Sequence, residues 1–205
     1  MSTKVFVVSL HRCGTRSTAR FLKELGLRSL HRPTEAGGVD LLKAVAGREA
    51  DLEAVADVMA PAIDAADAVA DVPIPAIYDI LARRYSNARF ILVWRDTNDW
   101  IDSVRRHSRE IGYLSPYGRA LYWRYFPRLR PRKIDELSDL ELLWMENRHT
   151  AEVISHFRSR PERLGVFHLT DPEIGSKISR FLGRPPNNDV PDFPDEGRSR
   201  VMSSA

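Results

Sequence analysis

The feature that most constrains the fold is a short apolar run near the N-terminus that ends in a polar loop. Residues Lys4–Ser9 read KVFVVS, a run rich in β-branched residues that is typical of a buried strand. Residues 15–25 then carry apolar or small side chains at helical spacing, and Gly26 marks the end of that helix. A strand that passes through a loop directly into a helix predicts an α/β fold.

Three further strand candidates alternate with helical sequence. The strands are Ala68–Val72, Ala88–Trp94 and Leu164–Leu169, and the expected helices are 38–65 (one or two helices), 76–85, 98–109, 138–158 and 172–182. This alternation predicts a three-layer α/β fold, in which helices cover both faces of a parallel β-sheet. The 205 residues are expected to form a single domain over 1–205, with a C-terminal tail from about 186 to 205.

The loop between the first strand and the first helix favours phosphate binding. Gly14 lets the backbone approach a ligand closely, and the helix that follows directs its first N–H groups into the loop. The same loop carries three hydroxyls and two guanidinium groups, on Thr15, Ser17, Thr18, Arg12 and Arg16. A capped turn alone requires fewer such groups. The loop is not the G-x-x-x-x-G-K-[ST] motif of magnesium-dependent kinases, because no lysine follows its glycine.

Positive charge and aromatic residues are concentrated in one segment. Between Arg105 and Lys133, eight arginines and one lysine accompany a single acid, Glu110, although the formal net charge of the chain is only +3. This excess predicts attraction to a nucleotide, an anionic acceptor, nucleic acid or a membrane surface, and a solvated basic face is the alternative. The aromatics are expected either in the core or in the wall of an acceptor pocket: Tyr113, Tyr117, Tyr122, Trp123, Tyr125 and Phe126.

Composition restricts the class of protein. The N-terminal apolar run is too short for a signal sequence or a membrane span. The one cysteine, Cys13, excludes an intrachain disulfide and a cysteine zinc cluster, which makes the reducing cytoplasm the expected location. With no H-E-x-x-H motif either, we expect a reaction that requires no metal ion.

A second motif follows the strand Ala88–Trp94. Arg95 stands at the end of that strand, and Ser103 lies eight residues further on, within the next helix. Together with the turn at Gly14, this pair resembles the sulfotransferases that use 3′-phosphoadenosine-5′-phosphosulfate (PAPS) and have a P-loop-like α/β fold. That family binds the 5′-phosphosulfate on a strand–loop–helix with a G-T-x-S-like turn, and the 3′-phosphate with an arginine and a serine eight residues apart. The segments DVPIPAIYDILARRYSNARFILVWRD and VFHLTDPEIGSKISRFLGRP are also similar to the family.

The resemblance implies PAPS as co-substrate and PAP as product. Arg12 falls where many members have a lysine that contacts the bridging and sulfuryl oxygens, which makes it a candidate catalytic residue. The 5′-phosphate would be held by the loop residues Arg12, Cys13, Gly14, Thr15, Arg16, Ser17 and Thr18, and the 3′-phosphate by Arg95 and Ser103. The family's G-x-x-G-x-x-K loop is not present in that form. The segment Gly197-Arg198-Ser199-Arg200, with Arg198 and Arg200, is the candidate to replace it, and a disordered basic tail is the equal alternative.

The acceptor requires a group that takes its proton. Asp71 ends a predicted strand and aligns with the family's catalytic histidine, although a helix cap or an ion pair with Arg12 would also explain it. His11 is the rival base or, equally, a hydrogen-bond donor to a phosphate, and His31 is a candidate for the wall of the acceptor pocket. His107 and His168 are expected to be structural. The acceptor is expected to be a small molecule, a glycan or a lipid that offers a hydroxyl or an amine, and anionic acceptors are included.

Two other functions stay open from the sequence. One is a P-loop-like nucleotide kinase or hydrolase that uses ATP and magnesium, which the missing lysine disfavours. The other is a non-catalytic module that binds a nucleotide or nucleic acid, which the basic segment favours. A nucleic-acid partner is the weaker of these expectations, because the chain contains no recognisable nucleic-acid-binding motif.

Overall fold

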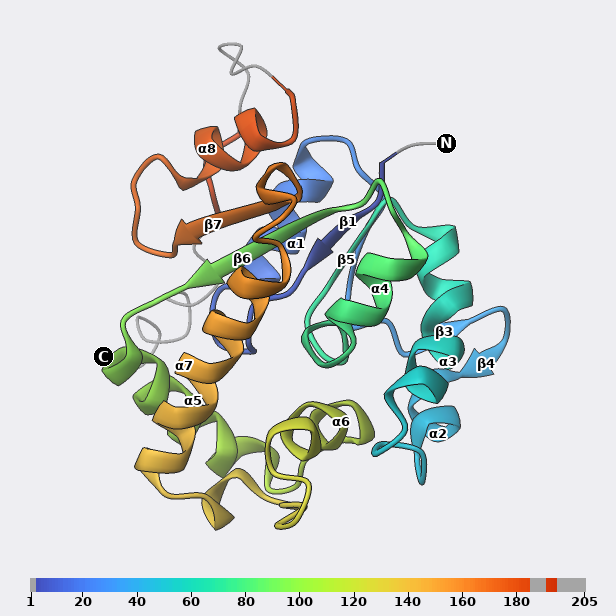
Figure 1. The fold of residues 1–205 in the computed structure, drawn as a ribbon, viewed down its shortest axis with the longest axis vertical. Coiled ribbons are helices and arrows are strands. Elements are labelled where there is room, and N and C mark those ends of the chain that lie inside the picture. Colours follow the sequence, from blue (N-terminus) through green and yellow to red (C-terminus); the bar gives the residue numbers. More distant parts are fainter. Residues whose placement is uncertain (1–2, 185–190, 195–205) are drawn as a thin grey trace, which may run out of the picture.

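A five-stranded parallel sheet forms the centre of the protein (Figure 1). The computed structural model describes residues 3–184 and 191–194. The strands lie in the order β2 (Ser29–His31), β5 (Ala68–Ala70), β1 (Val5–Val7), β6 (Arg89–Trp94) and β7 (Leu164–His168). Four of these confirm the expected strands. Strand β2 was not expected, because its three residues SLH are neither an apolar run nor a clear alternation.

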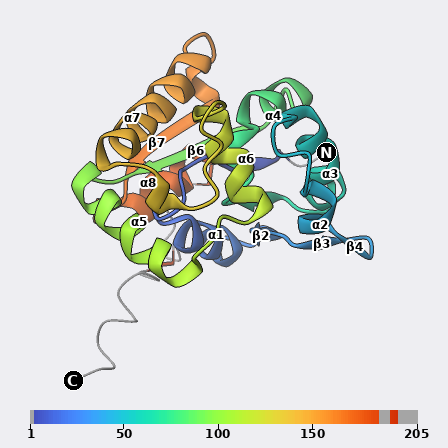
Figure 2. The ribbon, with the colours of Figure 1, turned by 90° about the horizontal axis from the view of Figure 1, so that it is seen from below.

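Side-chain alternation along the strands creates two cores. Val5 and Val7 of β1 pack with α1 (Thr15–Glu24) and α8 (Ile174–Phe181). Phe6 and Val8 point to the opposite face, where they join the larger core, which is covered by the remaining large helices. Those helices are α3 (Leu52–Ala65), α4 (Tyr78–Arg84), α5 (Thr97–Ile111), α6 (Pro116–Tyr125) and α7 (Asp139–His156). Figure 2 shows the sheet between the layer with α4 and α7 and the layer with α1, which confirms the three-layer architecture.

The region expected to be helical from residue 38 begins differently. Gly37 and Gly38 both have positive φ and turn the chain between two short antiparallel strands, β3 (Glu35–Ala36) and β4 (Val39–Asp40). The helices start only afterwards, as α2 (Leu41–Val45), capped by Asp40, and α3, capped by Asp51. The 3₁₀ turns η1 (Ile74–Ala76), η2 (Ile134–Glu136) and η3 (Pro161–Arg163) complete the described elements.

The topology places a ligand site between β1 and β6. From β1 the chain runs through α1 to the β2 and β5 side of the sheet, and after β6 it continues to β7 on the other side. Helix α1 packs on one face, whereas Trp100 and Val104 of α5 pack in the core of the opposite face. In open parallel sheets, ligands bind beyond the carboxyl ends of the strands at such a switch point.

A buried histidine joins three elements near this point. His149 on α7 is fully buried and donates from Nε2 to the carbonyl of Val8, 2.7 Å away. Its Nδ1 accepts the hydroxyl of Tyr125 on α6, also at 2.7 Å. Burial lowers the pKa of His149 to about 4, so the imidazole is neutral at pH 7.

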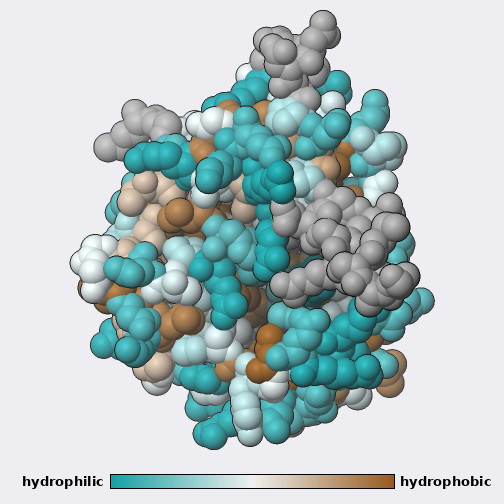
Figure 3. Space-filling view, turned by 180° about the vertical axis from the view of Figure 1, so that it is seen from behind, coloured by the Kyte–Doolittle hydropathy of each residue, from teal (hydrophilic) through white to brown (hydrophobic). Residues whose placement is uncertain are grey.

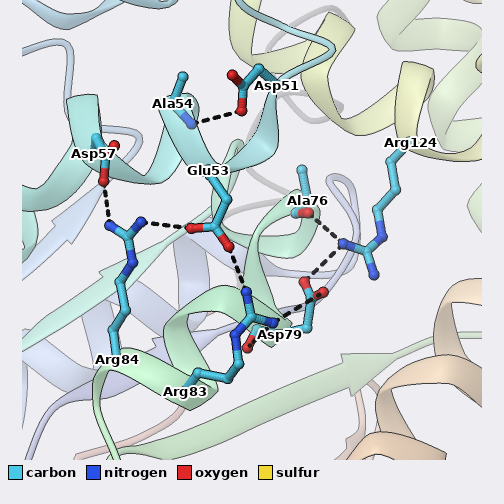
Figure 4. Close-up of polar contacts among 9 residues, drawn as sticks. All are labelled: Asp51, Glu53, Ala54, Asp57, Ala76, Asp79, Arg83, Arg84 and Arg124. Atoms are coloured by element: carbon cyan, nitrogen blue, oxygen red, sulfur yellow. Dashed lines mark hydrogen bonds and ion pairs between the residues drawn. The ribbon is translucent and has the colours of Figure 1, made fainter.

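Much of the basic segment is neutralised by acids from elsewhere in the chain. Arg124 pairs with Asp79 at 2.9 Å in a network that links α3, α4 and α6 (Figure 4). Arg119 pairs with Glu49, and Arg105 pairs with Asp139 at 2.7 Å. The expected excess of positive charge is therefore smaller in the folded protein than in the sequence. Of the aromatics in the segment, four are buried in the core: Tyr117, Tyr122, Tyr125 and Phe126.

On the face opposite to that of Figure 1, the hydrophilic side chains of the described residues surround scattered hydrophobic ones (Figure 3). Among residues 3–184 and 191–194, none of the helices is both long and apolar enough to cross a membrane. The predicted tail lies outside the described residues except at 191–194, where Phe193 packs against Phe21 of α1.

Candidate active site

The loop after β1 holds two residues in the left-handed region. Arg12 has φ 67° and Gly14 has φ 72°. A Cβ at position 14 would also meet the end of the Leu169 side chain, which follows β7 and would have to shift, so glycine is favoured there. Helix α1 starts at Thr15, with no side-chain cap and no acid in its first turn. Its first N–H groups and its positive dipole end therefore face the loop without a described anionic partner.

The two predicted phosphate motifs meet at this loop. The Nε of Arg12 donates to the hydroxyl of Ser103 on α5, 3.0 Å away. Arg95, at the end of β6, points Nη1 at the carbonyl oxygen of Arg12 at 3.5 Å and lies 3.7 Å from Asp99. The Nε of Arg95 is buried and has no partner in the described part of the chain. An oxyanion could satisfy that donor.

The site is rich in cations. Burial lowers the pKa of the Arg12 guanidinium, and Arg106, Arg16 and Arg95 lower it further against the opposing effect of Glu110. Arg16 is exposed on the first turn of α1, next to the loop. Neither Arg12 nor Arg16 forms an ion pair with any carboxylate among the residues that the structure describes. Such a cluster is stabilised when an anion binds.

The hydroxyls of the loop differ in their surroundings. Thr15, Ser17 and Thr18 are all buried. Thr18 donates its hydroxyl to the carbonyl of Gly14 at 2.9 Å, within the first turn of the helix. Thr15 lies 3.3 Å from Nε2 of His31. The hydroxyls of Thr15 and Thr18 thus already have protein partners.

Cys13 faces away from the loop. Its side chain is 4% exposed and belongs to the larger core. Burial raises the pKa of its thiol to about 12, and the carboxylate of Glu146 acts in the same direction. Only the backbone of Cys13 is available to a ligand at the loop.

The surroundings of His11 do not suit a general base. Its Nε2 is 2.8 Å from the hydroxyl of Tyr122, and its Nδ1 is buried with no described partner. Trp100 donates its indole N–H to the backbone carbonyl of His11 at 2.9 Å. Burial, together with His107, Arg12 and Arg32, lowers the pKa of His11 to about 3. A base with so low a pKa accepts protons poorly at pH 7.

Asp71 and His31 form a pair at the ends of neighbouring strands. Asp71 follows β5 with φ 72°, and its Oδ2 lies 3.2 Å from Nε2 of His31 at the end of β2. The nearby turn η1 is capped by Pro73 without a side-chain hydrogen bond, so Asp71 does not act as its cap. Its ion-pair partner is His31 and not Arg12. The Oδ1 atom of Asp71 is buried without a partner in the described structure.

Two further histidines of the sequence analysis have acidic neighbours. His107 is 3.5 Å from Glu110, and its ring centroid lies 6.3 Å from that of His11, next to the loop. His168 is 3.7 Å from Asp96 and 2.8 Å from the hydroxyl of Thr170. Arg198 and Arg200 lie outside the described residues. Within the described ranges there is no group of three or more histidine, cysteine or acidic side chains that could hold a metal ion.

One buried acid near the site was missed from the sequence. Glu146 on α7 is 7% exposed and accepts the hydroxyl of Thr97 at 3.2 Å, just beyond the end of β6. Burial raises its pKa. Its helical spacing in the sequence could have indicated that it is buried, because it shares one face of α7 with Leu142, His149 and Val153.

Comparisons with known proteins identify the family and the fold. A search of curated proteins finds no match to the sequence. Among solved structures, a sulfotransferase from Alicyclobacillus acidocaldarius matches with a TM-score of 0.54 and 16% identity, over 95% of this chain and 85% of that one. The similarity at this identity concerns the fold. The family model of the sulfotransferase domain matches residues 4–200, which include both phosphate motifs, and the chain therefore belongs to the sulfotransferase family.

Proposed function

We propose that the protein transfers a sulfuryl group from PAPS to a hydroxyl or an amine of an acceptor. The observation that carries this proposal is the 3.0 Å contact between Arg12 and Ser103. It joins two phosphate motifs that are 91 residues apart in the sequence, at the switch point of the sheet. The membership in the sulfotransferase family supports the type of reaction.

The residues at the loop fit a nucleotide with two separate anionic groups. In this proposal the N-terminus of α1 binds the 5′-phosphate with Gly14, Thr15, Arg16 and Ser17. Arg95 and the hydroxyl of Ser103 bind the 3′-phosphate. The unpartnered Nε of Arg95 supports this assignment, because a buried guanidinium donor is costly to leave unsatisfied.

PAPS supplies an activated sulfuryl group, and its transfer leaves PAP. Sulfuryl transfer is similar to phosphoryl transfer in passing through a loose transition state, so the protein contributes mainly positioning and charge stabilisation. Arg12 stabilises the negative charge that develops on the departing phosphate oxygen. Because Arg12 also donates to Ser103, the positions of the two phosphate subsites are coupled.

We further propose a small-molecule acceptor, or a glycan or lipid that presents a hydroxyl or an amine, and a cytoplasmic location. The exposed guanidinium groups of Arg16 and Arg32 favour an acceptor with anionic character. Nucleic acid is not part of the proposal.

A thermal-shift panel tests the proposal with PAP, ATP with magnesium, and a short oligonucleotide. A ligand that binds the native state at about 100 times its Kd adds roughly 2.7 kcal/mol of stability. PAP is expected to raise the melting temperature without magnesium and by more than the other two ligands. A larger shift with ATP and magnesium would contradict the proposal in favour of a kinase or hydrolase, and one with the oligonucleotide in favour of a binding module.

A further inference from the structure

His31 and Asp71 are brought together by the order of the strands. Strands β2 and β5 are parallel neighbours, and His31 is paired with Ala70, the residue before Asp71. Both side chains therefore lie at the carboxyl edge of the sheet, on the side of the phosphate loop. The contact to Thr15, the first residue of α1, fixes this position, since Thr15 Oγ1 lies 3.3 Å from His31 Nε2.

The contacts of Nε2 favour one tautomer of His31. Nε2 lies 3.2 Å from Oδ2 of Asp71 and 3.3 Å from the hydroxyl of Thr15, which can donate or accept. A carboxylate oxygen accepts hydrogen bonds, so the approach of Asp71 favours the tautomer with the proton on Nε2. Nδ1 then holds the free lone pair of the ring, and it has no partner among the described residues.

The two side chains have different access to solvent. The side chain of Asp71 is 12% exposed and that of His31 is 26% exposed. The second carboxylate oxygen of Asp71 is buried and faces no described donor. The carboxylate is thus the inner member of the pair, and the imidazole is the member that a bound acceptor can contact.

We propose that His31 is the general base of the transfer and that Asp71 is its positioning residue, an inference that rests on the proposed function. Nδ1 of His31 takes the proton of the acceptor hydroxyl while the acceptor oxygen forms its bond to sulfur. The bond between sulfur and the bridging phosphate oxygen breaks, and its electron pair stays on PAP. Asp71 holds the ring in the required tautomer and stabilises the imidazolium that forms.

The charges around the ring are consistent with this role. Burial lowers the pKa of His31, Asp71 raises it, and Arg16 and Arg32 lower it. The groups that face the ring are these three and the neutral hydroxyl of Thr15. The imidazole is therefore neutral at pH 7 and able to accept a proton, in contrast to His11, whose pKa of about 3 makes it a weak base.

The test compares His31→Gln and Asp71→Asn with a matched control, His168→Gln. His168 also ends a strand, is 26% exposed, and contacts an acid and a threonine hydroxyl. Release of PAP from PAPS is measured with water, 2-naphthol and 4-nitrophenol as acceptors, and the Kd for PAP is measured by calorimetry. In the wild-type protein, absence of PAP binding or of PAP release would contradict the proposed function itself.

We expect His31→Gln to lower turnover with 2-naphthol by about 10²–10⁴-fold and to leave the Kd for PAP within about twofold. Asp71→Asn should lower turnover similarly, because asparagine donates to Nε2 and moves the ring proton to Nδ1. The double variant should be no slower than His31→Gln. With 4-nitrophenol, which is largely ionised at pH 8 and needs no base, the loss should be much smaller. Imidazole in solution should partly restore His31→Ala.

Other outcomes overturn the inference. Normal turnover in His31→Gln together with a loss in Asp71→Asn would make Asp71 the base. Equal losses with both phenols, or in the control, would indicate a structural effect. Loss of PAP binding in His31→Gln would assign the ring to the phosphate site and not to the acceptor.

Discussion

Two groups of arginines in this protein have opposite surroundings. In the network of Figure 4, Arg83, Arg84 and Arg124 are matched by three acids, Glu53, Asp57 and Asp79, at distances of 2.5–2.9 Å. At the phosphate loop, the one ion pair that Arg12, Arg16 and Arg95 form with described residues is that of Arg95 with Asp99, at 3.7 Å. We call these groups the paired network and the loop arginines.

The difference separates structural from functional charge. The paired network is electrically balanced, so its arginines serve to hold α3, α4 and α6 together. Besides burial, Arg16 and Arg95 lower the pKa of Arg12 by repulsion, and the buried Nε of Arg95 has no described partner, so an anionic ligand would stabilise this group. Clusters of unbalanced cations at a switch point are therefore a stronger signal of function than the number of arginines in a segment.

Among the arginines, the largest effect on turnover is expected from Arg12→Ala. Removal of a group that stabilises charge in the transition state typically costs about 10²–10³-fold in kcat. Turnover of PAPS should fall by that amount, and Arg12→Lys should retain much more activity because it keeps the charge. Arg84→Ala is the control from the paired network and should change turnover by less than about twofold. Equal losses in Arg12→Ala and Arg84→Ala would remove the distinction between the two groups.

Arg95→Ala and Ser103→Ala sharpen the comparison through binding. Charged hydrogen bonds contribute roughly 1.5–3 kcal/mol each, so Arg95→Ala should weaken PAP about tenfold or more. AMP lacks the 3′-phosphate, and its affinity should change much less. Calorimetry with both nucleotides measures the difference, and Arg83→Ala is the control. If PAP and AMP are weakened equally, Arg95 supports the loop and does not bind the 3′-phosphate.

Arg124→Ala tests whether the paired network stabilises the fold. Arg124 donates to the carbonyl of Ala76 at 2.7 Å and to Asp79 at 2.9 Å, and it stacks on Tyr78. Its loss should lower the free energy of unfolding by about 1–3 kcal/mol, measured by urea titration. Arg12→Ala should leave that free energy unchanged or raise it, because the repulsion among the loop arginines decreases. If Arg12→Ala lowers the free energy of unfolding more than Arg124→Ala does, the distinction between the loop arginines and the paired network is contradicted.

The smallest effect is expected from removal of metal ions. The loop arginines supply the positive charge that a metal ion would otherwise provide at the phosphates. EDTA should therefore change turnover by less than about twofold. Activity that EDTA abolishes and magnesium restores would favour the kinase or hydrolase. The loop arginines would then bind a complex of a nucleotide and a metal ion.

The strands next to the phosphate loop could be predicted because their sequences are unambiguous. Runs such as KVFVVS and ARFILVW are apolar over their whole length, as strands buried on both faces must be. Strand β2 could not be predicted in the same way, since its three half-buried residues lie at the edge of the sheet and carry no periodicity. Without β2, the neighbour of Asp71 could not be identified.

The candidate site was predictable as a set of residues but not as a set of contacts. The spacing from Arg95 to Ser103 is visible in the sequence, whereas the contact of Ser103 with Arg12 depends on how α5 packs on the sheet. Similarly, nothing local to Arg124 or Arg119 indicates that Asp79 and Glu49 neutralise them. Tertiary structure decides which charges are balanced. The sequence alone therefore overestimates the positive charge that the basic segment presents.

The buried His149 makes the protein sensitive to acid. In the unfolded chain a histidine takes up a proton near pH 6.5, whereas the folded protein resists this until about pH 4. Between these values the unfolded state binds more protons, so the stability present above pH 6.5 is lost as the pH falls toward 4. The loss is on the order of 3 kcal/mol, a large part of the stability of a typical domain. The neutral imidazole that joins α6 and α7 to the strand before the phosphate loop thus sets a lower pH limit for handling and assaying this enzyme.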